Sequence, residues 1–397
     1  MSRLKLLELH SLEQLRANAA RWDDLWWRSD VAWPTCRAEM LAQWLEHFAP
    51  QARFHAWVVA DGDQWLAALP LYGSRMARVL TVGRLPGNEW GPAGDLLLDP
   101  ALISDPAIGD VALDLLVRGF NRSPWPLLWC DAAALDAPRW QALLAAMSRA
   151  GVKSHSNLRG EVGLVSIGND WDAYLAQRSR NHRRHMRVVS KKAEAGGEVR
   201  LVEFEDPPAA ELDGLIYQGF AVEDCNWKGR DGTSVFRTPG MLDYFVRQAQ
   251  QLREWGQLRL VMLTLDGQPI AFEYGWLAKE TYFAVKVGYD ERFSAYSPGQ
   301  LLRWRLFEKW HGNHAARLVD FAGPLVDATE KWTTSAYGVS RLAIAPRRFS
   351  SELLLNGVCR LRPALQKLIR RRRAGAIAAA GAATAEEPVL EPASAAE

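Results

Sequence analysis

Apolar and polar positions in the second half of the chain follow the pattern of consecutive β-strands. Residues 258–265 (LRLVMLTL) and 269–276 (PIAFEYGW) are β-rich runs, and the Asp-Gly pair at 266–267 between them is a strong hairpin signal. Residues 281–289 have the same character and follow a short polar turn. The pattern therefore predicts three strands in a row, of which the first two form a hairpin.

A helix is predicted soon after these strands. Ser297 suits an N-cap, Pro298 suits the first helical position, and Gly312 suits the far end of the run LLRWRLFEKWHG. A helix N-terminus beside a sheet exposes unpaired N–H groups and the positive end of a dipole, so it can hold a phosphate. This stretch supplies a mechanism for binding a phosphorylated carrier.

The rest of the chain alternates between helical and strand patterns. In the first part, helices are predicted at 11–27, 37–48, 110–120 and 137–150, and strands at 54–60, 65–71, 78–82, 95–98 and 126–130. In the second part, strands are predicted at 162–166, at 199–204 and in a run that ends at Asp320, and helices at 171–195, 209–223 and 239–255. We predict two domains, 1–158 and 159–348.

The end of the chain has a different character. Residues 351–373 mix leucines with a run of arginines, and Pro363 would break or kink a single helix there. We predict a basic amphipathic segment at 349–373, which could bind an anionic membrane surface or serve as a flexible exit from the domain. Residues 374–397 are rich in Ala, Glu and Pro, so we predict a disordered tail.

Composition places the chain in the soluble globular class, with 397 residues, 48% hydrophobic and 24% charged. The net charge of +2 gives no global field for nucleic acid, so we expect no DNA partner. Four cysteines without CxxC spacing favour free thiols in a reducing compartment. We see no signal peptide and no run of 18 apolar residues, and we therefore expect a cytoplasmic protein. The 18 tryptophans fit either core anchors or an aromatic groove for a sugar or acyl chain.

Several motifs resemble a known family. The pattern GYD…SPGQLL…VDFAG…EKW in residues 288–332 looks like the GNAT-type acetyltransferase domain of the bacterial family that includes CelD-type cellulose-biosynthesis proteins. Residues 180–197 and 223–229 (EDCNWKG) are similar to that family's basic helix and its Trp-Lys-Gly step. The resemblance implies an α/β fold of the α+β type. It would consist of two tandem GNAT-like domains related to FemAB-type transferases, each with a mixed, mostly antiparallel twisted sheet flanked by helices.

The resemblance also implies transfer of an acyl group from acetyl-CoA or a longer acyl-CoA to an amine or hydroxyl. One departure stands out: the common GNAT phosphate loop has two spaced glycines, whereas residues 292–299 contain only Gly299. FemAB-type relatives use a charged tRNA as donor, and that alternative stays open.

Such a transfer needs a proton acceptor, an oxyanion donor and a proton for the departing thiolate. Glu223 is our candidate general base, although it could be a solvated acid at a helix end, and Asp224 beside it would serve equally well. Asp290 could orient the acceptor or cap its loop. Tyr296 could protonate the thiolate or simply pack.

The binding candidates fall into two sets. Candidates for the carrier are Ser297, Gly299, Gln300 and Lys331. Candidates for the acceptor are Trp227, Lys228, Asp320 and Trp332. Lys331 could instead form a structural salt bridge.

The helix at 178–192 is strongly basic and is either a solvated face or a landing surface for a polyanion, such as the CoA 3′-phosphate, a lipid headgroup or RNA. His182 and His185 on it have no third ligand nearby, so we expect no metal.

The leading hypothesis is a GNAT acyltransferase that uses an acyl-CoA and acts on an amino-sugar, polysaccharide or other small or envelope-related acceptor. It would be cytoplasmic, with peripheral contact at the inner face of the membrane if 351–373 binds there. The alternatives are a FemAB-like aminoacyl-tRNA-dependent transferase and a non-catalytic GNAT-fold module in a polysaccharide synthase complex.

Overall fold

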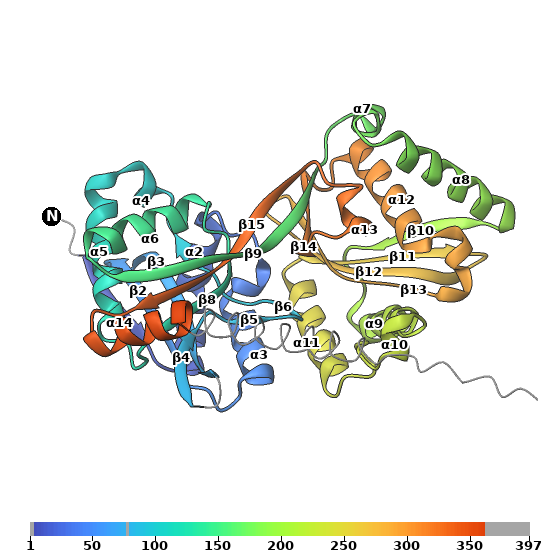
Figure 1. The fold of residues 1–397 in the computed structure, drawn as a ribbon. Helices are drawn as coiled ribbons and strands as arrows, with labels where there is room; N and C mark the ends of the chain where they lie inside the picture. Colours follow the sequence, from blue (N-terminus) through green and yellow to red (C-terminus); the bar gives the residue numbers. More distant parts are fainter. Residues whose placement is uncertain (1–3, 77–78, 362–397) are drawn as a thin grey trace, which may run out of the picture.

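One twisted sheet runs through the whole computed structural model, which describes residues 4–76 and 79–361 (Figure 1). Thirteen of the described strands form it, in the order β1-β2-β3-β4-β8-β15-β9-β14-β13-β12-β11-β10, with β7 paired to β3. All neighbours in the described sheet are antiparallel except two parallel pairs, β4 with β8 and β13 with β14. The sheet is therefore mixed and mostly antiparallel, as the fold-class prediction required.

The elements of the first half follow the predicted alternation closely. The strands are β1 (Leu4–Leu9), β2 (Phe54–Asp61), β3 (Gln64–Met76), β4 (Leu80–Arg84), β5 (Gly87–Asn88), β6 (Gly91–Pro92), β7 (Leu97–Leu98) and β8 (Leu128–Ala133). The helices are α1 (Leu12–Ala17), α2 (Ala19–Arg28), the 3-10 turn η1 (Pro34–Cys36), α3 (Ala38–Phe48), α4 (Ala101–Ser104), α5 (Pro106–Phe120) and α6 (Pro138–Arg149). The predicted helix at 11–27 is two helices, because the chain turns at Asn18.

The second half contains the predicted strand block. Its strands are β9 (Lys153–Ser166), β10 (Val199–Phe204), β11 (Leu258–Leu265), β12 (Gln268–Ala278), β13 (Thr281–Tyr289), β14 (Leu318–Pro324) and β15 (Ser335–Ala345). Its helices are α7 (Trp171–Ala176), α8 (Arg180–Gly196), α9 (Ala209–Asp224), α10 (Trp227–Arg230), α11 (Met241–Glu254), the 3-10 segment η2 (Glu291–Tyr296), α12 (Pro298–Asn313) and α13 (Asp327–Glu330).

Three local predictions about these helices are wrong. The helix predicted at 171–195 is broken, because Ser179 caps α8 by accepting from the backbone N–H of His182. The side chain of Ser297 makes no capping hydrogen bond, since the residue is left-handed with φ of 47°. Gly312 lies inside α12, which is terminated by His314 in the left-handed region.

The two halves share one hydrophobic core. Helices α1 to α3 of the first half and α9 and α11 of the second half bury apolar side chains in a single cluster. Trp33 stacks on Phe283 with ring centroids 4.3 Å apart, and the guanidinium of Arg37 lies 3.4 Å from the ring centroid of Trp255. The ammonium of Lys279 donates to three carbonyl groups of the first half, among them that of Val31 at 2.7 Å.

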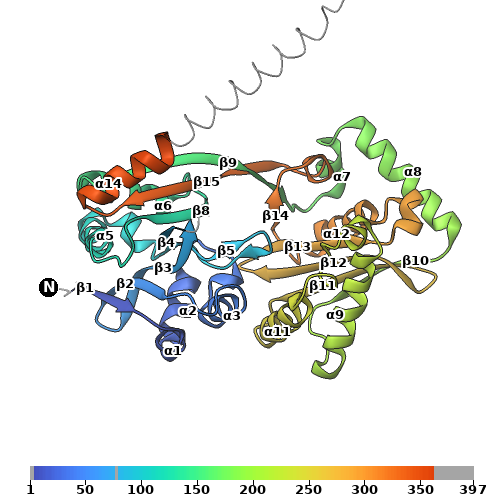
Figure 2. The same cartoon turned by 60° about the horizontal axis from the view of Figure 1, so that its bottom comes forward.

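Strands β9 and β15 carry the chain between the halves (Figure 2). They pair along their whole shared length, from Ser335 opposite Leu164 to Ala345 opposite Lys153, and β15 also pairs with β8 of the first half. The predicted boundary between residues 158 and 159 therefore lies inside β9, and the sheet is continuous across it.

The start of the predicted basic segment at 349–373 belongs to the folded body. Helix α14 (Phe349–Asn356) packs Leu355 against the β15 side of the first half, and a π-helical turn, η3 (Gly357–Leu361), follows. The remainder, 362–373, and the tail predicted at 374–397 lie outside the described residues. In the part of the chain that the structure describes, no helix has the length and apolarity needed to cross a bilayer.

Candidate functional site

The parallel strands β13 and β14 pair over only three residues and then separate. Thr281 lies opposite Leu318, and the last pair is Phe283 with Asp320. Among the described residues, the edge of β13 that faces β14 has no strand partner from Ala284 to Tyr289, so its backbone groups there are open to pairing. This free edge leads directly into η2 and the N-terminus of α12.

The N-terminus of α12 is held between α8 and α13. The Ser297 hydroxyl lies 3.4 Å from Nε2 of His185 on α8. Gln300 donates from Nε2 to the carbonyl of Ala328 and accepts from Nε1 of Trp332, at 3.2 and 2.7 Å. The Gln300 and Trp332 side chains therefore bind each other, and the backbone N–H of Gln300 donates to the Ser297 carbonyl at 2.9 Å.

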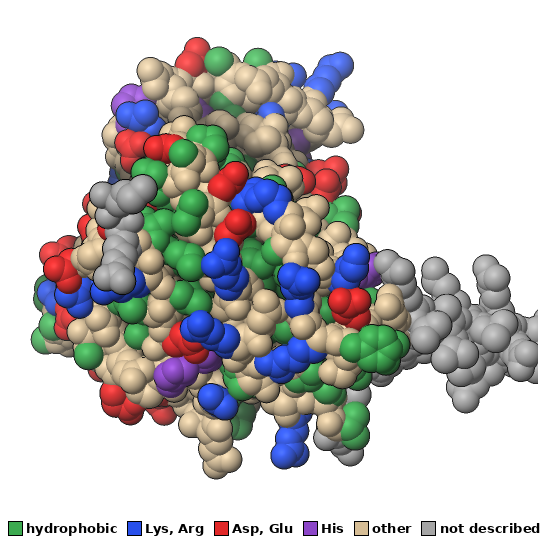
Figure 3. Space-filling model, turned by 90° about the vertical axis from the view of Figure 1, so that its left-hand side faces the viewer, with side chains coloured by type: hydrophobic (Ala, Val, Ile, Leu, Met, Phe, Trp, Pro, Cys, Tyr) green, Lys and Arg blue, Asp and Glu red, His purple; other side chains and the backbone are tan. Residues whose placement is uncertain are grey.

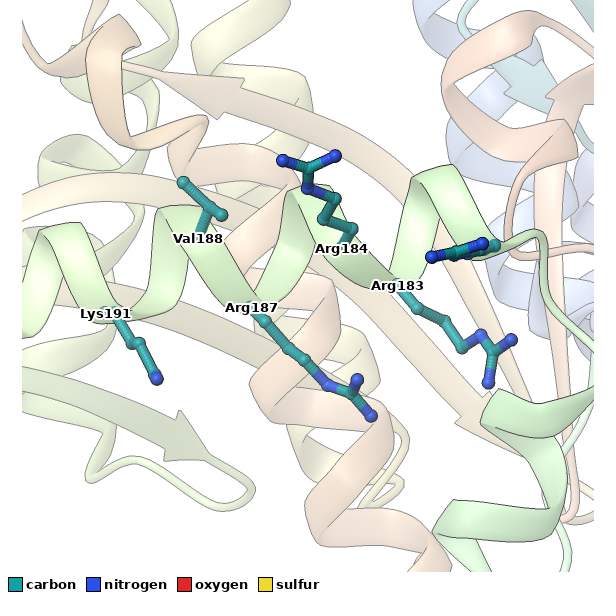
Figure 4. Close-up of a pocket in the computed structure, with 6 residues that line it drawn as sticks. Arg183, Arg184, Arg187, Val188 and Lys191 are labelled. Atoms are coloured by element: carbon teal, nitrogen blue, oxygen red, sulfur yellow. The ribbon is translucent and has the colours of Figure 1, made fainter.

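Helix α8 presents a cationic face beside this terminus. We define the α8 cationic face as Arg180, Arg183, Arg184, Arg187 and Lys191, which line a shallow hollow around the exposed Val188. In Figure 4, Arg183, Arg187 and Lys191 project to one side of the helix, and Arg184 and Val188 project to the other.

None of these cations forms an ion pair with a described residue, whereas most arginines elsewhere in the described structure do. By contrast, Figure 3 shows the side of the molecule that lies at the left of Figure 1, and there cations and anions lie side by side. Like charges three and four residues apart destabilise a helix, and cations in its first turns oppose the dipole. The α8 cationic face is therefore unfavourable unless an anion covers it.

Buried nitrogen donors without partners lie at the start of α8. His182 is 5% exposed, and no described group bonds its Nε2. Burial lowers the pKa of His182 to about 4, with Lys331 contributing. The Nε atoms of Arg178 and Arg183 also lack partners among the described residues. Arg178 and Lys331 line a second hollow together with Gln177, Ser179, Asp327 and Glu330. Lys331 forms no ion pair in the described structure, so its predicted salt bridge is absent there.

The other face of the sheet carries the predicted base. Glu223 lies in the last turn of α9 and is 2% exposed, so the alternative of a solvated helix-end acid is wrong. Its carboxylate accepts from Nζ of Lys228 at 2.7 Å and from the backbone N–H of Val235 at 3.2 Å. Gly288 on β13 leaves room for α9, since a Cβ there would lie 2.4 Å from Cα of Glu223. Trp227 beside them is 48% exposed.

Asp290 and Tyr296 lie at either end of η2. Asp290 caps that turn, accepting from the backbone N–H of Arg292 at 3.0 Å and from its guanidinium, whose hydrogen bonds lower the carboxyl pKa. The structure therefore shows the capping role that was the alternative for Asp290. Tyr296 packs against α8, where its hydroxyl faces Gly196 and its ring lies 5.7 Å from Nζ of Lys192.

Lys286 was missed by the sequence reasoning. Its ammonium lies 4.1 Å from the ring centroid of Trp90 and 5.7 Å from that of Phe245. Burial lowers its pKa to about 8, although nearby Glu223 opposes this. The available signal was a single lysine inside the otherwise uncharged strand at 281–289. Trp90 comes from the β5–β6 turn, so both halves of the chain contribute to this cluster.

Asp320 lies within β14 and does not end it. It is 5% exposed and accepts from Tyr337 Oη at 2.9 Å and from the Ala322 backbone N–H at 2.7 Å. Burial raises its pKa to about 6 despite these two bonds. The side chain therefore sits at the point where β13 and β14 part, and its hydrogen bonds are to the sheet.

Comparisons with known proteins agree with this geometry. Residues 180–331 match the family of acetyltransferase (GNAT) domains. The structure of FemX is similar with a TM-score of 0.55 at 11% identity, covering 85% of this chain and 96% of that one. A conserved protein of unknown function from Bacteroides thetaiotaomicron VPI-5482 has a TM-score of 0.50 at 11% identity, covering 87% of this chain and 100% of that one. No curated protein sequence matches the chain. The chain therefore has the predicted α/β architecture of the α+β type, a mixed, mostly antiparallel sheet flanked by helices, and its residues 180–331 match a GNAT domain.

Proposed function

We propose that this protein is an acyl-CoA-dependent acyltransferase. The observation that carries the proposal is the separation of β13 from β14 after Phe283 and Asp320, with the N-terminus of α12 at the end of the free strand edge. The match of residues 180–331 to acetyltransferase (GNAT) domains supports it. The motif resemblance to CelD-type proteins further suggests an amino-sugar, polysaccharide or other envelope-related acceptor.

The donor's phosphates fit the α12 side of the sheet. The backbone N–H of Gly299 lies at the positive end of the α12 dipole, and Gly299 has no side chain to obstruct approach. The α8 cationic face and Lys331 would neutralise the remaining phosphate charge. The thioester arm would then lie along the free edge of β13, where amide groups of the arm can pair with strand backbone.

The acceptor would approach from the α9 side. Its amine or hydroxyl attacks the thioester carbonyl carbon, the C–S bond breaks, and the acceptor's proton passes to a base while the thiolate gains one. Glu223 and Lys286 are the two candidate bases, and Tyr296 is the candidate donor to the thiolate. Trp227 and Lys228 lie beside Glu223 and would contact the acceptor, with Asp290 holding the loop.

The second candidate is an aminoacyl-tRNA-dependent transferase. The specific observation in its favour is the α8 cationic face, whose uncompensated charge suits a phosphate backbone as well as a nucleotide. A non-catalytic role would leave both donors unbound.

Calorimetric titration with acetyl-CoA and longer acyl-CoAs separates these functions. We expect saturable binding that the charge-reversed variant R184E/R187E weakens, while R75E/R159E does not. Arg75 and Arg159 are exposed arginines outside α8 that form no ion pair with a described residue, so this double variant matches the charge change. Binding of charged tRNA that falls steeply with salt, with no response to any thioester, would replace the first proposal by the second.

A further inference from the structure

A second set of chemically capable side chains lies at the edge of the first half, far from α8. Glu8, His10 and His55 form the one group of three or more metal-ligand residues found among the described residues. They lie near the N-terminal end of the chain, at the left of Figure 1, whereas α8 is at the right. Nothing in the proposed transfer reaction uses them.

Strand register explains why these residues meet. Strand β1 pairs antiparallel with β2, with Glu8 opposite Trp57 and Leu9 opposite Ala56, so His10 follows opposite His55. Alternate residues of a strand share a face, and directly opposed residues share it too. Glu8 and His10 on one strand and His55 on the next therefore project from the same face of the sheet edge.

The distances between their ligand atoms suit a small cation. Nδ1 of His10 lies 3.2 Å from Nδ1 of His55. The Oε2 atom of Glu8 lies 3.6 Å from Nε2 of His55 and 4.0 Å from Nε2 of His10. One ligand atom from each residue can be chosen so that all three lie within 4.8 Å of one another. Ligand atoms about 2.1 Å from a tetrahedral ion are roughly 3.4 Å from one another, so side-chain movements of about an ångström would bring these three atoms to coordinating distances.

Two further observations point to a ligand. His55 is 1% exposed, and its Nε2 is buried without a hydrogen-bond partner among the described residues. A hydrogen bond between the two imidazoles would satisfy Nδ1 of His55 but would leave this nitrogen unpaired. Nη1 of Arg122 lies 3.5 Å from Oε1 of Glu8, on the carboxylate oxygen other than the one nearest the imidazoles, where outer partners of metal ligands are found.

We infer that Glu8, His10 and His55 bind a divalent transition-metal ion of the zinc type. Two imidazoles and a carboxylate suit Zn²⁺, and the side chain of His10 is 48% exposed, which leaves an open position for water. The expectation of no metal rested on His182 and His185 alone and did not consider residues paired across strands.

The bound ion would cross-link β1 to β2. Strand β1 is the terminal strand of the sheet and pairs only with β2 among the described strands. Ser11, next to His10, starts α1 by accepting from the backbone N–H of Gln14. Metal binding would therefore fix both the edge strand and the entry to α1.

Titration of Zn²⁺ into the metal-free, untagged full chain tests the inference. We expect one saturable site per chain, an upward shift of the thermal midpoint, and visible absorption when Co²⁺ replaces Zn²⁺. H10Q and E8Q should each weaken binding by at least about 10-fold, the scale set by losing even an outer partner. H155Q, which removes a half-buried histidine outside the cluster, should leave it unchanged.

Two outcomes overturn the inference. One is the absence of saturable Zn²⁺ binding to the folded wild-type chain. The other is equal Zn²⁺ affinity in wild type, H10Q and E8Q, which would place the ion elsewhere. Because the readouts are metal binding and thermal stability, neither result depends on the proposed transferase activity.

Discussion

Replacing Asp320 by asparagine should stabilise the protein at neutral pH. The carboxyl is 5% exposed, and burial raises its pKa from an ordinary value of 3.8 to about 6. A group whose pKa is higher in the folded state favours folding at low pH, and this stability is lost as pH rises from about 4 to about 6. Asparagine has the same shape and carries no charge. Its oxygen can accept from the Ala322 N–H, and its amide can donate to Tyr337.

The size of the effect follows from the shift. A difference of about 2.2 pKa units corresponds to about 3 kcal/mol at about 1.4 kcal/mol per unit. Above pH 7 the wild-type chain should therefore be less stable than D320N by about 3 kcal/mol, and at pH 3.5 the two should be equal.

Urea denaturation of both proteins at several pH values measures this difference directly. Other titrating groups contribute equally to both proteins, so the wild-type-minus-variant curve isolates Asp320. A difference that stays constant from pH 3.5 to pH 8 would refute the reasoning. If Asp320 also contacts the acceptor, the stabilised variant should have a raised KM, which is the usual exchange of stability for function.

Three further predictions concern other positions. S297G should raise the free energy of unfolding by about 1 kcal/mol in urea melts, because Ser297 has a left-handed backbone and its side chain makes no capping hydrogen bond. A lower free energy of unfolding would mean that the Ser297 hydroxyl stabilises α12. G219V should lower the free energy of unfolding by about 1–3 kcal/mol, since even a Cβ there would lie 2.2 Å from Phe272. An unchanged free energy of unfolding would show that α9 can move off the sheet. In an acetyl-transfer assay, wild-type kcat/KM should rise with pH around 8 and K286M should lose that rise; a rise that persists in K286M would exclude Lys286 as the base.

The strand block was predictable because its signals are local. The bounds of β10, β11 and β13 agree with those predicted, since an Asp-Gly turn and dense apolar runs define them. The early part of β9 was missed, because residues 153–161 are mostly polar and exposed and carry no apolar alternation. Its pairing with β15, almost two hundred residues later, is set by the whole sheet, and neither segment carries a local sequence signal for it.

The candidate site was predictable only in outline. Ser297 and Gln300 flank one helix start and were expected together, whereas the hydrogen bond between Gln300 and Trp332 was not predicted. The burial of Glu223 against Gly288 and the approach of Lys286 to the first half depend on how α9 and the β5–β6 turn pack. Such contacts join segments far apart in sequence, and no local pattern encodes them.

The position of β15 has a consequence for synthesis on the ribosome. This strand sits between β8 and β9, yet it is made after every other described strand. The sheet therefore emerges with a gap between β8 and β9 that can be filled only when residues 335–345 leave the exit tunnel. Until then two strand edges stay open, so a nascent chain stalled before residue 335 should be the form most in need of a chaperone.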